Sequence, residues 1–369
     1  MRRALAAAVA ALVVASPAAA GPPQVTARAF YLENGATGEA LAGEDARARL
    51  PIASITKLMT VLIALERAQL DDVVVAPPIA ANVGESTIHL RAGERITVHD
   101  LVEAALVQSA NDAAWALAAY VGKGDVPAFV HLMNAKAKAL GMRDTRFTRP
   151  DGLDAPGHVS SARDVTLLAR VAMQNATIRS IVDDRVATIA GGRRLHTWND
   201  LLATFPGVIG VKTGHTEAAG WSQVVAVRGY GFVLYATILG SPTRSERNAD
   251  LAALLRWGLS RYKPVPVVDA KRVYARAEIG FGKWPVAVVA PRAVVRAVRV
   301  DRTLRERLVV PTVLALPVRK GQRVGEVRVY DGARLVASSP LVAGRAVEKP
   351  GFGARIGWYA RHAVDKVLP

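Results

Sequence analysis

Apolar residues recur at helical spacing in four stretches of the chain. Within each stretch they stand three and four positions apart, which is the pattern of a helix that buries one face. In the first stretch this face comprises Leu58, Val61, Leu62 and Leu65. The predicted helices cover 54–68, 100–121, 125–140 and 161–173.

Strand patterns lie on both sides of these helices. Expected strands cover 27–33, with a short return strand after a turn at 34–38, and then 207–212, 222–228 and 232–239. The last two are joined as a hairpin across a Gly-Tyr-Gly turn, and a helix over 248–259 closes the region. Because strands at both ends enclose helices, we predict an α+β fold with an antiparallel sheet and a helical cluster.

A different pattern begins after residue 262. The run at 263–266 reads KPVP and is typical of a linker. Beyond it, short β-rich runs alternate with turns to about residue 344, and Asp331-Gly332 is a strong hairpin signal. The expected strands cover 286–290, 293–300, 327–330 and 335–337. The pattern predicts a small all-β second domain.

The two ends of the chain have their own patterns. Arg2 and Arg3 precede an apolar run at 4–15 and a small-residue cleavage site at 18–20, which is typical of a secretory signal peptide. An uncleaved anchor is the alternative. In the tail, residues 352, 356, 359, 363 and 367 are apolar and share one helical face. We expect domains at 1–20 (signal peptide), 25–262 (catalytic), 265–345 (β-rich) and 350–369 (amphipathic helix that associates with a membrane).

Composition and charge limit the classes of protein and of binding partner that are possible. The chain has no cysteine, so an exported form contains no disulfide and carries no lipid-modified cysteine. Its formal charge is +17. An exported basic protein meets anionic lipid or cell-wall polymer and not nucleic acid. A basic surface with no partner is the plainer interpretation.

Three short motifs lie in a fixed order on the predicted elements. Residues 54–57 read SITK, residues 109–111 read SAN, and residues 212–214 read KTG. The first opens a predicted helix, the second interrupts one, and the third ends a strand. Together they resemble the S-x-x-K, S-x-N and K-T-G set of penicillin-binding proteins and serine β-lactamases.

These residue types suit acyl transfer to a serine. Residues i and i+3 share a helix face, so Lys57 can act as the base for Ser54 if its pKa is lowered by burial or by a nearby charge such as Lys212. The hydroxyl of Ser109 can relay a proton to the leaving amine, and the amide of Asn111 can hold a substrate carbonyl. Gly214 lets substrate approach the strand edge, where a backbone N–H completes an oxyanion hole.

Each motif alone also fits an ordinary structural role: a helix start with a surface lysine, a cap or turn, or a strand end. All three in this order are not expected by accident. Val211 replaces the glycine that a phosphate-binding loop needs before its lysine, so we exclude that site. The seven histidines show no metal-ligand spacing. We therefore expect no metal and no cofactor.

The chain resembles the D-alanyl-D-alanine carboxypeptidases, the low-molecular-mass penicillin-binding proteins of the type-5/6 group. The resemblance extends from about residue 25 to the end. The segments that carry it are PIASITKLMT, LVQSANDAAWALA, GVKTGHT, ALGMRDTRFTRPDGLDAPGHVSSARD and PVRKGQRVGEVRV. It implies a penicillin-binding-protein/β-lactamase-like domain followed by a β domain, and a tail helix on the outer face of the cytoplasmic membrane.

The resemblance also implies a role for each site residue. Ser54 is the expected nucleophile and Lys57 its general base, assisted by Ser109, Asn111 and Lys212. Substrate binding is expected from Thr213, Gly214, His215 and Arg247, with Thr213 and Arg247 on the terminal carboxylate. The implied partners are the peptidoglycan stem peptide ending in D-Ala-D-Ala, β-lactam antibiotics, and an anionic membrane surface at 350–369.

The leading functional hypothesis is removal of the terminal D-Ala from peptidoglycan stems in the periplasm. A β-lactamase is disfavoured, since no E-x-x-L-N motif is present. An endopeptidase of the same superfamily stays open. A non-catalytic penicillin sensor is the third alternative, which the intact nucleophile and base disfavour.

Overall fold

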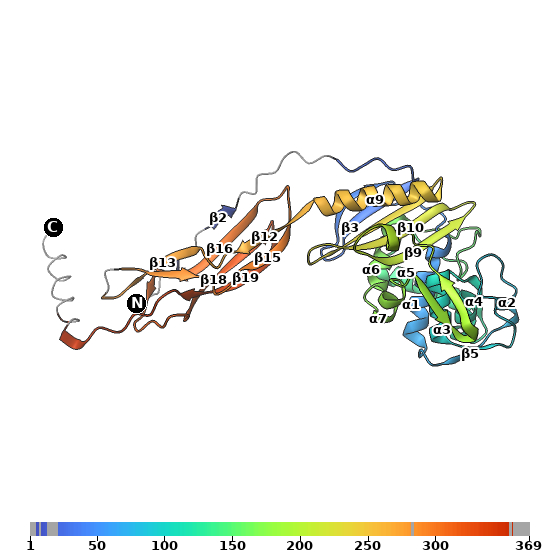
Figure 1. Ribbon diagram of the computed structural model, residues 1–369, viewed down its shortest axis with the longest axis horizontal. Helices are drawn as coiled ribbons and strands as arrows, with labels where there is room; N and C mark the ends of the chain where they lie inside the picture. The colour runs from blue at the N-terminus through green and yellow to red at the C-terminus, as the bar shows by residue number, and fades with distance from the viewer. Residues whose placement is uncertain (1–4, 7–8, 13–20, 282–283, 354–355, 357–369) are drawn as a thin grey trace. The chain divides into compact units, whose positions relative to one another are not determined.

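The structure of the protein is a computed structural model, which describes residues 5–6, 9–12, 21–281, 284–353 and 356 (Figure 1). The chain forms two compact units. The first comprises residues 20–260, and the second comprises residues 261–369 together with 1–19. Each unit has its own buried apolar core.

The unit 20–260 is built on a five-stranded sheet in which all neighbouring strands are antiparallel, as the sequence predicts. Its order is β4-β3-β11-β10-β9. The strands are β3 (Ala29–Asn34), β4 (Glu39–Glu44), β9 (Val208–Thr216), β10 (Gly220–Arg228) and β11 (Val233–Ser241). The K-T-G motif lies in β9, so it occupies an edge strand with one side open to a ligand.

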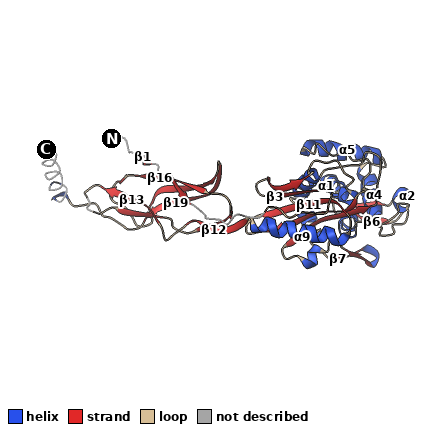
Figure 2. Ribbon diagram, turned by 90° about the horizontal axis from the view of Figure 1, so that it is seen from above, coloured by secondary structure: helices blue, strands red, loops and turns tan. Residues whose placement is uncertain are grey.

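Helices cover both faces of this sheet. α9 (Arg244–Ser260) lies on one face, while α1 (Lys57–Arg67) and α5 (Val126–Leu140) lie on the other (Figure 2). α6 (Ala162–Ala172) packs directly on β11 and β3. The side chains from Lys57 to Ala64 are all buried, so α1 forms the centre of the helical cluster. This explains its nearly continuous apolar sequence.

The predicted helix over 100–121 is interrupted in the structure. α3 (Val98–Glu103) passes into a π-helical turn (Ala104–Gln108), and α4 (Asn111–Val121) follows. Between them Ser109 has the left-handed φ of 67°. The shorter helices are α2 (Pro78–Ala81), α7 (Ala176–Ile181) and α8 (Leu201–Thr204). Side chains of Thr97, Asp125 and Ser161 cap α3, α5 and α6, because each accepts a bond from the first turn.

Two small hairpins were not expected from the sequence. β5 (Val73–Val75) pairs with β6 (Arg95–Thr97), and β7 (Val186–Ile189) pairs with β8 (Arg193–His196). Their strands are only three or four residues long. Such short runs give little alternation from which a strand could be predicted.

The second unit is all β in its described residues, apart from a fragment of helix near its end. Its larger sheet has the order β1-β16-β18-β19-β14-β13-β17, with β2 also on β16. The strands are β1 (Leu5–Ala6), β2 (Val9–Leu12), β13 (Val273–Ile279), β14 (Val286–Val289), β16 (Leu304–Pro311), β17 (Val313–Leu314), β18 (Arg323–Asp331) and β19 (Arg334–Ala343). The Asp331-Gly332 hairpin joins β18 to β19, as predicted.

The predicted linker at 263–266 is wrong. These residues belong to β12 (Tyr262–Val268), which pairs with β15 (Val294–Arg299). The two strands form a separate two-stranded sheet. The nitrogen of each β12 proline has no hydrogen to donate, and it can lie on the side of β12 that faces away from β15. The last helix of the first unit also differs, since it begins at Arg244 and not at residue 248.

The two chain ends are covered only in part. The predicted leader contains β1 and β2, and its cleavage stays a prediction. Most of the predicted tail helix lies outside the described residues. None of the helices in the described part of the chain is long and apolar enough to span a membrane.

Candidate active site

Ser54 lies in the turn that leads into α1. A 3₁₀ turn (Ala53–Thr56) precedes the helix, and Ala53 has a left-handed φ of 48°. The sequence predicts a helix that opens at Ser54, and the tighter turn keeps the same i, i+3 relation. Lys57 therefore donates from Nζ to Ser54 Oγ over 2.7 Å.

Lys57 is fully buried behind Ser54. Its Nζ also donates to Asn111 Oδ1 at 2.6 Å and to the Asp151 carbonyl at 2.8 Å. Burial lowers the Lys57 pKa from 10.5 to about 7, against the opposing effect of the Asp151 carboxylate. A lysine with this pKa is partly neutral at neutral pH, so it can accept a proton from Ser54.

The second motif supports the pocket from the α4 side. Asn111 begins α4, and its backbone N–H and its Nδ2 donate to the carbonyls of Ser86 and Gly84 at 2.7 and 2.9 Å. The next residue, Asp112, accepts from the backbone N–H groups of Ile88 and Leu90. The start of α4 thus holds the backbone of the 84–90 loop in a fixed position beside Ser54.

The third motif meets the second through Lys212. Its Nζ donates to Ser109 Oγ at 2.8 Å and to the Thr213 carbonyl at 2.9 Å. Burial lowers the pKa of Lys212 well below its usual value, and the charges of Lys57 and Arg247 lower it further. Two hydrogen-bonded serine–lysine pairs, Ser54 with Lys57 and Ser109 with Lys212, therefore lie at the pocket, and the charge of one lysine acts on the other.

Gly214 allows β9 to pass close to Ser54. A Cβ at this position would lie 2.7 Å from the carbonyl oxygen of Ile52 and 3.1 Å from the backbone nitrogen of Ser54. Only glycine fits at this distance without displacing the turn. The edge of β9 and the backbone of Ser54 are thereby brought together, which is the arrangement that an oxyanion hole requires.

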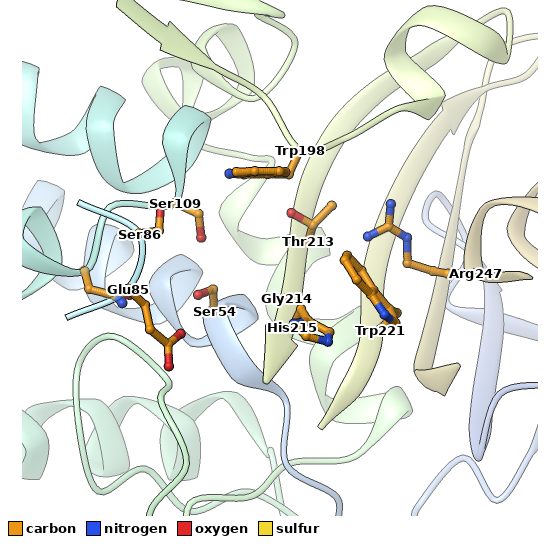
Figure 3. A pocket seen from close by; sticks show the side chains of 11 residues that line it. Ser54, Glu85, Ser86, Ser109, Trp198, Thr213, Gly214, His215, Trp221 and Arg247 are labelled. Carbon is orange, nitrogen blue, oxygen red and sulfur yellow. The ribbon is translucent and has the colours of Figure 1, made fainter. Parts of the chain in front are cut away.

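These groups surround a pocket of about 200 Å³ (Figure 3). Its lining residues are Ser54, Glu85, Ser86, Ser109, Asn111, Trp198, Thr213, Gly214, His215, Trp221 and Arg247. Lys57 and Lys212 reach the pocket through their hydrogen bonds to the two serines. The structure thus brings all nine sequence-predicted site residues to one place.

Arg247 enters the pocket from the first turns of α9. Its side chain is 1% exposed, and Nε and Nη2 both donate to Asn248 Oδ1, at 3.1 and 2.8 Å. Asp200 lies 3.4 Å from the same Nη2. The guanidinium carbon is 5.7 Å from the ring centroid of Trp221. Burial lowers the Arg247 pKa to about 10, so the side chain remains a cation at neutral pH.

Four lining residues were missed by the sequence reasoning: Glu85, Ser86, Trp198 and Trp221. Trp221 stands opposite His215 in the β10–β9 register, and their rings lie 4.0 Å apart. Pairing the two predicted strands in this register would have placed Trp221 beside His215 and so predicted it as a lining residue. The other three occupy loops and belong to no motif, and Trp198 is held there by an indole N–H bond to the Gln108 carbonyl at 3.1 Å.

A second layer of polar groups supports Lys57 from behind. The Asp151 carboxylate accepts from Arg149 and from the indole N–H of Trp115. His158 is buried; its Nε2 lies 2.8 Å from Thr56 Oγ1, and its Nδ1 accepts from the backbone N–H of Thr148 at 3.0 Å. Burial lowers the His158 pKa to about 4, so the ring is neutral.

Among the residues that the structure describes, one group of possible metal ligands lies outside the pocket. Ligand atoms of His99, Asp100 and Glu103 lie within 4.8 Å of one another on α3. The sequence reasoning did not anticipate this grouping. All three are partly exposed, and the His99–Glu103 pair has the ordinary i, i+4 spacing of a helix surface. We assign it no role.

The fold and the paired serine–lysine contacts define a serine enzyme of the penicillin-binding-protein class. A sequence model of the family described as D-alanyl-D-alanine carboxypeptidase matches residues 16–243, and one described as the C-terminal domain of penicillin-binding protein 5 matches residues 262–349. The chain belongs to the D-alanyl-D-alanine carboxypeptidase family.

Similar proteins cover nearly the whole chain. D-alanyl-D-alanine carboxypeptidase DacD from Salmonella typhimurium is 31% identical over 92% of this chain and 91% of its own. DacC from Escherichia coli is 31% identical over 90% of this chain and 87% of its own. Among solved structures, penicillin-binding protein 5 from Haemophilus influenzae aligns with a TM-score of 0.66 at 27% identity, over 89% of this chain and 100% of that chain.

Proposed function

We propose that this protein is a serine-type D-Ala-D-Ala carboxypeptidase that removes the terminal D-Ala from peptidoglycan stem peptides. The observation that carries the proposal is the 2.7 Å contact between the buried Lys57 Nζ and Ser54 Oγ, at the floor of a pocket whose far side carries Arg247. The family and the names of its relatives support the same substrate.

The first half of the reaction is acylation. Neutral Lys57 takes the hydroxyl proton as Ser54 Oγ attacks the carbonyl carbon of the penultimate D-Ala. Backbone N–H groups of Ser54 and of β9 stabilise the oxyanion. The C–N bond then breaks. Ser109, bonded to Lys212, relays a proton to the departing amine, so that free D-Ala leaves.

The second half is hydrolysis of the ester on Ser54. Lys57 has received the serine proton and Ser109 has supplied one to the leaving amine, so transfer of a proton from Lys57 to Ser109 restores a neutral base. Water then attacks the ester carbonyl and gives a proton to Lys57. As the tetrahedral intermediate collapses, Lys57 returns this proton to Ser54 Oγ, the bond between the acyl carbon and Ser54 breaks, and the shortened stem leaves. A β-lactam enters the same path, and its ring opening forms the acyl-enzyme without a departing fragment.

Thr213 and Arg247 hold the terminal carboxylate in this proposal. Thr213 lines the pocket from β9, and the guanidinium of Arg247 faces the same space (Figure 3). Asn111 and the open edge of β9 hold the amide groups of the stem, as a strand added to the sheet would be held.

Release of free D-Ala from a peptide ending in D-Ala-D-Ala tests the function. The mature protein, residues 21–369, should release D-Ala, and its Ser54→Ala variant should not. If neither protein releases D-Ala while the first is still acylated by penicillin, the carboxypeptidase assignment is wrong. Cross-linked muropeptide would then distinguish an endopeptidase from a sensor.

We further propose export to the periplasm and peripheral attachment to the outer face of the cytoplasmic membrane through 350–369. The basic, apolar-striped tail and the leader pattern at 1–20 support this. Deleting 350–369 should abolish sedimentation with anionic vesicles and leave D-Ala release intact. Equal sedimentation of the truncated protein would reject the tail as the anchor.

A further inference from the structure

Glu85 is an acidic group in a pocket that otherwise gathers cations. It lines the pocket together with Ser54 and Arg247, and its side chain is exposed. Its charge acts on Lys57 and on Arg149, so the carboxylate lies near the reacting centre. Nothing in the proposed mechanism uses it.

Neither of these cations forms a salt bridge with Glu85. Lys57 Nζ is occupied by Ser54, Asn111 and the Asp151 carbonyl. Arg149 is bound in a bidentate manner to the Asp151 carboxylate. No hydrogen bond or salt bridge of the Glu85 carboxylate is found within the described ranges.

The position of Glu85 is nonetheless fixed. Its neighbours on either side, Gly84 and Ser86, offer their carbonyls to Asn111, and Ser86 Oγ donates to the Gln108 carbonyl at 2.9 Å. Glu85 itself has a left-handed φ of 63°. A residue without glycine's freedom is held there only when its surroundings determine the conformation. The carboxylate is thus presented from a rigid part of the loop.

Glu85 and Arg247 lie on opposite sides of Ser54 (Figure 3). In the proposed function the scissile carbonyl is at Ser54 and the terminal carboxylate is on the Arg247 side. The acyl part of the substrate must therefore extend from Ser54 toward Glu85. The first residue beyond the scissile D-Ala on that side is the one that precedes D-Ala-D-Ala, so its side chain is the first to meet Glu85.

We propose that Glu85 is a specificity determinant for substrates whose residue before D-Ala-D-Ala carries a free primary ammonium group. The inference rests on the proposed function and names the substrate class of that site. A carboxylate and an ammonium attract each other at this exposed position, while an acylated amine loses the charge. The preference is therefore electrostatic and decreases as salt is added.

The test compares two peptides that differ in one charge. Nα-acetyl-L-Lys-D-Ala-D-Ala has a free side-chain amine, and the Nα,Nε-diacetyl peptide does not. The measured quantity is the ratio of their kcat/KM values within each protein, so any effect of Glu85 on Lys57 cancels. Wild type at low salt should favour the free amine roughly two- to fivefold, and 0.5 M salt should bring the ratio to about one.

Three variants complete the experiment. Glu85→Gln should give a ratio of about one, and Glu85→Lys a ratio below one. Glu44→Gln makes the same charge change on β4, at the opposite edge of the sheet from β9, and should keep the wild-type ratio. A wild-type ratio that Glu85→Gln leaves unchanged, or a wild-type ratio of one at low salt, overturns this inference alone. Failure of wild type to hydrolyse either peptide overturns the proposed function, and this inference with it.

Discussion

Lys57 and Ser54 are joined by a 2.7 Å hydrogen bond across one turn, and the lysine has no exposed surface. This contact combines two properties that the site needs, the position of the amine and its basicity. The turn places the amine on the serine, and burial makes that amine a base near neutral pH. The chemistry of the site therefore depends on the packing of α1 as much as on the motif.

The rate of acylation should rise with pH through about 7. Burial lowers the Lys57 pKa to about 7, and only the neutral amine accepts the Ser54 proton. Below pH 7 the lysine is protonated and the rate falls about tenfold per pH unit; above it the rate is constant. Stopped-flow acylation by a fluorescent penicillin from pH 5 to 9 measures this. A flat profile across that range would show that Lys57 is not the base.

Arg247→Lys should weaken discrimination between a peptide acid and its C-terminal amide. The guanidinium is oriented by two bonds to Asn248, and an ammonium cannot reproduce that fork. A charged hydrogen bond of this kind contributes about 1.5–3 kcal/mol, so the preference for the acid should fall roughly 10- to 100-fold. Arg170→Lys, at the Glu33 pair on β3, is the control. If Arg247→Lys retains the full preference, the carboxylate is bound elsewhere.

Gly214→Ala should slow acylation by about 100-fold or more. The new Cβ would lie 2.7 Å from the Ile52 carbonyl and 3.1 Å from the Ser54 nitrogen, so the nucleophile turn must move. A displacement of about 1 Å at a reacting centre has an effect of this size. Gly280→Ala adds the same methyl where nothing lies within 4 Å, and it should react normally. Normal acylation of Gly214→Ala would show that the turn is not fixed by β9.

His158 should make the protein less stable in mild acid. Burial lowers its pKa from 6.5 to about 4, so the folded protein holds the ring neutral while the unfolded chain protonates it. The contribution of the neutral His158 ring to the free energy of unfolding is fully present above pH 6.5 and is lost as the pH falls through about 4. The full difference is on the order of 3 kcal/mol.

Urea unfolding at pH 7 and pH 5 measures this effect. His158→Gln should show a smaller loss of unfolding free energy between the two values than wild type. The exposed His131→Gln should behave as wild type does. An identical pH dependence for His158→Gln would assign the acid sensitivity to other groups.

The sequence predicted the arrangement of the first unit because its elements have strong patterns. The helices are long enough to show their period, and β9, β10 and β11 follow one another as a simple antiparallel run. The break at Ser109 was predicted as well, because a polar S-x-N triplet interrupts an apolar run. What the sequence did not show was how the chain bends there, through a π-helical turn and a left-handed serine.

The prediction failed where local preference and pairing disagree. Two prolines at 264 and 266 indicated a linker, yet these residues form β12, because pairing with β15 along one side tolerates prolines. In the site, Glu85 and Trp198 were missed for a related reason. They lie in loops whose course is set by distant contacts, such as the bond that Asn111 donates to the Gly84 carbonyl and the bond that Trp198 donates to the Gln108 carbonyl.

Locating the acyl group on the protein tests whether Ser54 is the residue that is acylated. The mature protein is incubated with penicillin, digested, and the modified peptide is identified by mass spectrometry. We expect one adduct, on Ser54, and none in Ser54→Ala. An adduct on another residue, or an equal yield of adduct in Ser54→Ala, would show that Ser54 is not the nucleophile.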